Sequence, residues 1–381
     1  MTTNSQTPFL VFDCDPGCDD ALAISLVLRA NNYKQIEILT VAGNVGVDSA
    51  TTNALRLVTI ALSNNSKTSV KVFKGCGRSL TGWELPASNV HGRDGLGDIP
   101  ESFLKKKGPN VRKSQKMHAV QRILQIVNER EPFDLLCTGP LTNLATALTL
   151  MDSLQQDRFW KLAKRVVWMG GQFQTAGNIT PASEFNIFHD PVAAQIVLDS
   201  WRVASARPND TQKERFPKIR LVPIDATEQI VLSLECKTSP PASSDLGSFL
   251  RSALITYGRF HAIACLNPKE NYHDRDEKVF KSHLLGSSGI KEWKPFCYVH
   301  DALAAWVMIN GFDKPGYRWK QMKIRIDTSR GETRGHVFDM GQKAQPFSVN
   351  APEIGTSVYW LEAITLNKSE KLLKELNTIL L

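Results

Sequence analysis

Four carboxylates lie close together near the start of the chain, in the segment VFDCDPGCDDALA. They belong to Asp13, Asp15, Asp19 and Asp20. On a strand ending at this segment, Asp13 and Asp15 would point to the same side at the carboxyl end. Oxygen ligands without histidine are what hard cations such as Ca²⁺ and Mg²⁺ prefer. The residues could instead be two turn residues and two helix caps. We favour a shared cation, because four like charges at one turn otherwise repel each other.

The elements that must position these residues alternate along the chain between strands and helices. Predicted strands cover Leu10–Cys14, Ile36–Ala42, Val70–Phe73, Phe133–Thr138, Arg165–Met169 and Ile219–Pro223. Predicted helices include Asp20–Ala30, Asp48–Leu62, Gln115–Glu129, Val192–Leu198 and Leu246–Leu266. This order predicts an α/β fold with a single open, mostly parallel, Rossmann-like sheet and helices on both faces. Such sheets bind ligands beyond the carboxyl ends of their strands.

The carboxyl-terminal part continues the same domain. Met322–Ile326 and Thr333–Met340 have the pattern of partner strands, and Lys368–Leu381 that of an amphipathic closing helix. The chain has no internal repeat or low-complexity linker, so we expect one domain over 1–381. Segment 205–217 is polar and charged, with two prolines, and we interpret it as a surface insertion. Segment 267–295 is charged and irregular and could be a second insertion or a mobile segment.

Polar residues follow several of the predicted strands. Asn44 lies in the turn Ala-Gly-Asn after the second strand, and the backbone carbonyl of Thr138 ends another strand where a cation could use it. Glu184 and Asn186, two residues apart, could form a patch that binds sugar hydroxyls or a helix-capping network. Asn178 lies just before them.

Histidines and aromatic residues occur in three other places. The long glycine-rich loop with Trp83 and His91 could be a lid or a surface excursion. Tyr257 and His261 are four residues apart on one helix face, where they could join a proton relay or simply pack. Near residue 300, VHDALAA again places an acidic residue at the start of an apolar helix.

Composition limits the class of partner. The chain has 381 residues and a net charge of +8, but its basic residues form short runs such as the lysines at 105–107, without interleaved aromatic residues. We therefore expect solvated loops and no nucleic-acid partner. The first eight residues carry neither a basic nor an apolar signal segment, and no run of about 18 apolar residues follows. We expect a cytoplasmic protein with no membrane partner. The seven cysteines have no paired spacing and fit reduced thiols, with Cys14 in the core.

Taken together, these motifs resemble those of the nucleoside hydrolase family, the inosine-uridine preferring nucleoside N-ribohydrolases. The resemblance runs over nearly the whole chain. It depends on five blocks in the family's order: DCDPGCDDALA, AGN, TGPLTNLA, MGG…GN…EFN…DP and VHDALAA.

The resemblance implies a Ca²⁺ ion and a set of site residues. The implied metal ligands are Asp15, Asp20, the carbonyl of Thr138 and Asp301, with Asp13 supporting them from behind. The implied ribose-binding and neighbouring residues are Asp19, Asn44, Asn178, Glu184, Phe185 and Asn186, with backbone near Met169. His300 resembles the family's general acid, and His91 its companion near the base. The family also implies a homo-oligomer, a dimer or a tetramer.

The implied reaction is hydrolysis of the N-ribosidic bond to free base and ribose. Asp15 would deprotonate a water bound to the ion, and the charges of Asp19 and Glu184 would stabilise an oxocarbenium-like ribosyl group. His300 would protonate the departing base, since an unperturbed histidine has a pKa near 6.5.

The base side of the site matches the family less closely. Trp83 could stack on a purine or belong to the core. Tyr257 and His261 could join a proton relay or simply pack, so the base preference stays open.

Two other functions fit parts of the sequence. One is a haloacid-dehalogenase-like phosphohydrolase, which the Asp13-x-Asp15 spacing suggests, although Gly17 stands where that motif needs Thr or Val. The other is a non-catalytic paralogue that binds a nucleoside or Ca²⁺.

Overall fold

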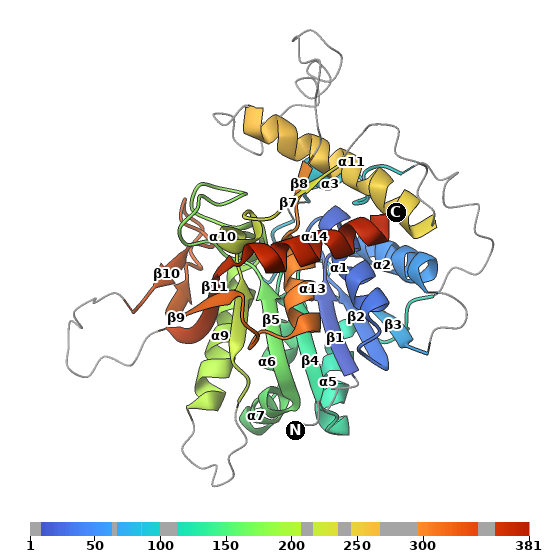
Figure 1. Ribbon diagram of the computed structural model, residues 1–381. Helices are drawn as coiled ribbons and strands as arrows, with labels where there is room; N and C mark the ends of the chain where they lie inside the picture. Colours follow the sequence, from blue (N-terminus) through green and yellow to red (C-terminus); the bar gives the residue numbers. More distant parts are fainter. Residues whose placement is uncertain are drawn as a thin grey trace.

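The computed structural model describes residues 9–62, 67–84, 86–99, 113–206, 216–234, 245–266, 296–341 and 355–380 (Figure 1). The predicted insertion at 267–295, most of that at 205–217 and the lysines at 105–107 lie outside the described residues. Among the described helices, none combines the length and the apolar character needed to cross a membrane.

A mostly parallel sheet forms the centre of the described chain, as predicted. Its nine strands follow the order β10-β9-β11-β6-β5-β4-β1-β2-β3. The bounds are β1 Phe9–Cys14, β2 Gln35–Thr40, β3 Ser69–Lys74, β4 Phe133–Cys137, β5 Ala163–Met169, β6 Ile219–Val222, β9 Tyr317–Ile326, β10 Val337–Asp339 and β11 Thr356–Ile364. The strands from β3 to β11 in this order pair in parallel, and β9 and β10 pair antiparallel at one edge.

Helices cover both faces of the sheet, and each face has its own apolar core. One core contains residues of α1 (Cys18–Ala30), α2 (Val47–Ala61), α11 (Asp245–Leu266), α13 (His300–Asn310) and α14 (Leu366–Leu380). The other contains residues of α5 (Ala119–Glu129), α6 (Thr142–Leu150), α7 (Ser153–Leu162) and α9 (Pro191–Ser205). Figure 1 shows α11 lying across the end of the sheet where the parallel strands finish, next to the small antiparallel pair of β7 (Val231–Ser233) and β8 (Phe296–Tyr298).

The central strands are buried because helices cover both of their faces. Every residue of β1 is buried, and Leu10, Phe12 and Cys14 point into one core while Phe9 and Val11 point into the other. This alternation has the period of two expected for a strand. It confirms that Cys14 is a core residue.

Several predicted boundaries were wrong for identifiable reasons. Helix α5 begins at Ala119 and not near Gln115, because His118 caps it: its ring nitrogen accepts a hydrogen bond from the Val120 amide at 3.2 Å. The strand predicted over Thr333–Met340 is only Val337–Asp339, since the residues before it form a turn in which Gly335 has a φ of +76°. Strand β11 was not predicted, although it joins the parallel strands to the antiparallel edge.

Candidate active site

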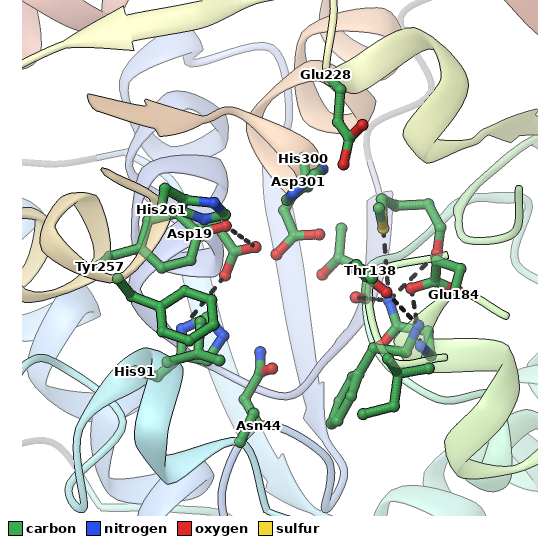
Figure 2. Close-up of a pocket in the computed structure, with 18 of the residues that line it drawn as sticks. Asp19, Asn44, His91, Thr138, Glu184, Glu228, Tyr257, His261, His300 and Asp301 are labelled. Carbon is green, nitrogen blue, oxygen red and sulfur yellow. Dashed lines mark hydrogen bonds and ion pairs between the residues drawn. The ribbon is translucent and has the colours of Figure 1, made fainter. Parts of the chain in front are cut away.

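The predicted site residues converge at the point where the strand order reverses. From β1 the sheet continues through β2 to one side and through β4 to the other. The turns after β1 and β4 therefore separate there and leave room for a ligand. A cavity lies at this point (Figure 2). Of the predicted site residues, its lining includes Asp19, Asn44, His91, Thr138, Met169, Asn178, Glu184, Phe185, Asn186, Tyr257, His261, His300 and Asp301.

Buried carboxylates form one end of the site. Asp19 and Asp20 lie in the first turn of α1, and Asp301 lies in the first turn of α13, which packs against α1. One carboxylate oxygen from each of the three residues can be chosen so that all lie within 4.8 Å of one another. Asp19 was expected to bind ribose only, but the geometry also places its carboxylate among the candidate metal ligands.

Asp15 lies directly after β1, beneath this carboxylate cluster. Its Oδ2 accepts a hydrogen bond from the Asn44 amide at 2.7 Å, whereas its Oδ1 is buried and has no hydrogen-bond partner in the described part of the chain. Two glycines pack against it: a Cβ on Gly139 would lie 2.8 Å from Oδ1, and one on Gly43 would overlap Oδ2. A buried oxygen without a partner is costly unless a ligand satisfies it.

Asp20 is held by three hydrogen-bond donors. Its Oδ1 accepts from the Thr138 hydroxyl at 2.7 Å. Its Oδ2 accepts from the Gly17 amide at 3.0 Å and from Asn44 Nδ2 at 3.3 Å. The residues after β1, β2 and β4 are thus tied together around one carboxylate, which connects sequence blocks more than a hundred residues apart.

The electrostatics of this cluster favour a bound cation. Burial raises the pKa of Asp15, of Asp20 to about 7 and of Asp301, and neighbouring carboxylates raise each of these pKa values further. For Asp301 those neighbours are Asp19, Asp20 and Asp15. Such groups ionise readily only when positive charge is placed among them. The all-oxygen donor set and the unpartnered Asp15 oxygen therefore fit a hard divalent cation.

Thr138 and Asp13 have further partners. The Thr138 carbonyl accepts a hydrogen bond from Asn186 Nδ2 at 2.8 Å, which leaves one of its lone pairs available. Asp13 Oδ1 accepts from Asn143 Nδ2 at 2.8 Å, and Oδ2 is unpartnered among the described residues. Burial raises the pKa of Asp13 to about 7, against the opposing effect of the Asn143 hydrogen bond. Asp13 lies behind the cluster, outside the cavity lining.

Glu184 forms the helix-capping network that was one of the two alternatives for this segment. It caps α8 (Phe185–His189), because its carboxylate accepts hydrogen bonds from the amides of Asn186 at 2.8 Å and Ile187 at 3.1 Å. It also lines the cavity, on the side opposite His91 in Figure 2. Asn178 Oδ1 accepts from the Phe185 amide at 2.8 Å and thereby fixes the start of the same helix.

Aromatic and histidine side chains form the other wall. The His91 ring stacks on Tyr257 with centroids 5.1 Å apart, and its Nδ1 accepts from the Cys18 amide at 3.1 Å. The Tyr257 hydroxyl donates to Asp19 Oδ2 at 3.3 Å. His91 belongs to α3 (Ser88–His91), so part of the glycine-rich loop forms the cavity wall. The structure thus brings Tyr257 to the site together with His91.

His300 lies at the start of α13 with its Nδ1 2.6 Å from the Thr227 hydroxyl. Thr227 ends α10 (Ile224–Thr227), which directly follows β6. The expectation of an unperturbed pKa near 6.5 was wrong. Burial lowers the pKa of His300 to about 4, with nearby Asp19 opposing and His91 reinforcing this effect. The ring is therefore neutral at pH 7.

Trp83, predicted for the base side, does not line the cavity. Its ring contacts Phe188 edge-on at 5.7 Å, and the Arg334 guanidinium lies 4.7 Å from the ring centroid. With 38% of its surface exposed, Trp83 is not a core residue either.

Glu228 is a cavity-lining residue that sequence reasoning missed. It directly follows Thr227, in the turn after β6, and is half-buried. The rule that ligands bind after the carboxyl ends of parallel strands points to this turn as it does to Asp15 and Thr138. The predicted strand Ile219–Pro223 could therefore have led to it.

Comparison with known proteins points to one family. The family model "Inosine-uridine preferring nucleoside hydrolase" matches residues 10–361. An inosine-uridine preferring nucleoside hydrolase of Leishmania major is 38% identical over 200 residues, 51% of this chain and 58% of that protein. A probable uridine nucleosidase of Arabidopsis thaliana is 33% identical over 258 residues, 67% of this chain and 71% of that protein.

Solved structures give the same result. A plant nucleoside hydrolase superposes with a TM-score of 0.71 at 25% identity, covering 98% of this chain and 99% of that one. An inosine-guanosine nucleoside hydrolase superposes with a TM-score of 0.69 at 22% identity and shows the shared fold. The chain therefore belongs to the nucleoside hydrolase family, whose members act on the N-glycosyl bonds of nucleosides.

Proposed function

We propose that this protein hydrolyses the N-ribosidic bond of ribonucleosides of the uridine and inosine type, releasing free base and ribose. The observation that carries the proposal is one cavity with two chemically different ends. Carboxylates that can surround a ribosyl cation lie at one end, and histidines that can face a base lie at the other. The match of the family model over residues 10–361 supports the same reaction.

The carboxylate end is suited to bind ribose. Asp15, Asp20, the Thr138 carbonyl and Asp301 would hold the divalent cation, which we propose to be Ca²⁺. When bound, it would keep these carboxylates ionised, anchor the ribose diol and make a water molecule more acidic. Asp15, whose Oδ1 has no partner among the described residues, would accept a proton from the attacking water.

The remaining polar residues would bind and stabilise the sugar. Asn44, Asn178 and Asn186 have amide groups at the cavity and can share hydrogen bonds with ribose hydroxyls. Bond cleavage leaves positive charge on the ribosyl ring, and the carboxylates of Asp19 and Glu184 face the same cavity. Negative charge placed where positive charge develops stabilises the transition state.

His300 would protonate the departing base. Its ring is neutral in the free protein, and its Nδ1 is engaged by the Thr227 hydroxyl, so Nε2 is the nitrogen free to face the base. The ring would take up a proton from solvent at Nε2, pass that proton to the base as the bond breaks and return to its neutral form. Electron density moves onto the base as the bond breaks. The base then becomes a stronger hydrogen-bond and proton acceptor at the moment when the proton is needed. His91, stacked on Tyr257, would shape the same side of the cavity.

The proposal is tested by measuring reducing sugar released from uridine, inosine, cytidine, adenosine and guanosine, with and without a chelator. We expect ribose from uridine or inosine, loss of activity with chelator and recovery with Ca²⁺. Hydrolysis of phosphate esters without any release of ribose would favour the phosphohydrolase alternative. Binding of nucleoside without turnover would favour the non-catalytic one.

The acid role has its own test. His300→Ala should slow inosine hydrolysis by about 10²–10⁴-fold, the usual range for loss of a general acid. It should affect p-nitrophenyl riboside far less, because that leaving group needs no proton. Equal losses on both substrates would refute the role. The single domain, the cytoplasmic location and the homo-oligomer predicted from the sequence stay predictions.

A further inference from the structure

The base end of the cavity contains two polar side chains for which the described part of the chain offers no hydrogen-bond partner. His261 is 5% exposed, and neither of its ring nitrogens has a hydrogen-bond partner among the described residues. The ring is enclosed by other rings, with centroids 4.4 Å from Tyr257, 5.1 Å from Tyr298 and 6.2 Å from His300. Both ring nitrogens of this buried imidazole are therefore available to a molecule bound in the cavity, which would satisfy them.

Glu228 is the second of these residues. It is half-buried and lines the same cavity, and Figure 2 draws it above His300 and Asp301. In the described part of the chain its carboxylate takes part in neither a hydrogen bond nor an ion pair. Its position beside His300 is set by the backbone, because the preceding residue, Thr227, holds the His300 ring through its hydroxyl.

The two ends of the cavity differ in how their polar atoms are satisfied. Glu184 and Asp20, at the ribose end, accept hydrogen bonds from several protein donors. Glu228 and His261 do not accept or donate such bonds among the described residues, so their polar groups are available to a bound molecule. If the ribose binds among the carboxylates, as the proposed function requires, the bound group that faces Glu228 and His261 is the base.

We propose that Glu228 is a specificity-determining residue, whose carboxylate accepts the ring N–H of a lactam base such as hypoxanthine, guanine or uracil while His261 donates to the same base. This inference rests on the proposed function and deepens it. A carboxylate can only accept, and hydrogen bonds with an ionised partner are the stronger ones. A lactam N–H beside a carbonyl is a more acidic donor than the amino group of adenine or cytosine. The ring nitrogens of adenine and cytosine that take its place are acceptors and would face the carboxylate unfavourably.

The test compares inosine with 1-methylinosine, which has a methyl group in place of this N–H hydrogen, and with p-nitrophenyl riboside, which has no lactam. Wild-type protein, Glu228→Gln and Glu228→Ala are assayed at pH 8 with inosine, 1-methylinosine and p-nitrophenyl riboside. Burial and the charge of Asp225 raise the pKa of Glu228 to about 7, so the carboxylate is mostly ionised at that pH. The exposed Glu332→Gln, far along the chain at a surface turn, is the matched control and should leave all three activities unchanged.

We expect Glu228→Ala to lower kcat/KM for inosine about 10-fold, mainly through KM, since a ground-state hydrogen bond to a charged group is lost. Glu228→Gln keeps one acceptor and should lose less. Wild-type protein should disfavour 1-methylinosine by a similar factor, and the variants should no longer distinguish it from inosine. Activity on p-nitrophenyl riboside, which has no lactam, should not change.

Two results would overturn the inference. One is equal wild-type kcat/KM for inosine and 1-methylinosine. The other is an equal loss on all three substrates in Glu228→Ala, which would indicate a general structural role. If wild-type protein released no ribose from any substrate, the proposed function would fail instead. Calorimetric titration with inosine and 1-methylinosine would then decide the role of Glu228 alone, and equal affinities would refute it.

Discussion

Replacing Asp20 with Asn tests whether the buried, clustered carboxylates lower the stability of the metal-free protein, and whether a bound cation restores that stability. Burial and Asp19 raise the pKa of Asp20 from 3.8 to about 7 in the folded protein. The folded state then binds more protons than the unfolded state. The free energy of unfolding of the metal-free protein therefore falls as the pH rises from about 4 to about 7. At pH 8 the penalty is fully present and amounts to roughly 4 kcal/mol.

The Asn variant should recover much of this penalty because it fits the same hydrogen bonds. Its amide oxygen can accept from Gly17 and Asn44, as Asp20 Oδ2 does at 3.0 Å and 3.3 Å. Its NH₂ group would face the Thr138 hydroxyl, which can turn to accept. We expect metal-free Asp20→Asn to be more stable than wild type at pH 8 by about 1–4 kcal/mol, with a smaller difference at pH 5.

Calcium should reverse the ranking of the two proteins. With free Ca²⁺ at a hundred times its dissociation constant, the wild type gains about 2.7 kcal/mol. For a chain of 381 residues the unfolding entropy is about 0.8 kcal/mol/K, so this gain raises Tm by about 3 °C. Asp20→Asn lacks one anionic ligand and should gain much less.

Thermal unfolding followed by circular dichroism, in EDTA and in Ca²⁺ at pH 8 and pH 5, measures all of these values. Glu332→Gln removes an exposed carboxylate and should behave as wild type throughout. The reasoning is refuted if metal-free Asp20→Asn is no more stable than wild type at pH 8. A Ca²⁺ response in the variant equal to that of the wild type would refute the ligand assignment.

Three further substitutions test the arrangement around the cavity. Asp15→Asn should lower ribose release by about 10²–10⁴-fold while far-UV circular dichroism stays unchanged, and retained activity would exclude Asp15 as the base. Thr227→Val removes the hydrogen bond to His300 and should lower kcat for inosine about 10-fold, while kcat for p-nitrophenyl riboside should hardly change. Equal losses of kcat on both substrates would indicate a packing defect. Gly43→Ala would overlap Asp15 Oδ2 and should abolish both activity and the Ca²⁺ response, whereas Gly46→Ala meets nothing within 4 Å and should be neutral.

The carboxylate end of the site could be predicted from the sequence because its residues follow local rules. Asp15 and Thr138 follow strands that are readable as buried apolar runs, and Asp20 and Asp301 begin apolar helices. In a parallel sheet, the turns after neighbouring strands must meet. Local spacing and one topological rule were therefore enough to predict that Asp15 and Thr138 lie together. Asp301 was added to them because the VHDALAA block resembles that of the family.

The wall formed by aromatic and histidine side chains could not be predicted in the same way, because no rule of spacing or sheet topology says which loop contacts which helix. His91 comes from a short helix in a long loop, and Tyr257 lies on a helix that crosses the end of the sheet. Trp83 shows the difficulty most clearly. Its type suggested stacking on a base or burial in the core, yet Arg334, 251 residues later, covers its ring outside the cavity. Spacing carries no information about such a contact.

The pKa of His300 depends on this second wall, and that dependence has a consequence for catalysis. The ring is neutral because residues from α1, α3, α10 and α11 close around it and remove water, and no one of these segments lies near it in sequence. A ring with such a low pKa is protonated only transiently at pH 7, and the negative charge that develops on the departing base favours the protonated ring that donates to it. The cleavage rate should therefore depend on how well the protein holds the base in line with His300. That position is set by the rings packed beside His300, those of Tyr298 at 5.8 Å and His261 at 6.2 Å between centroids, whereas Glu228 would act on the binding and selection of the base.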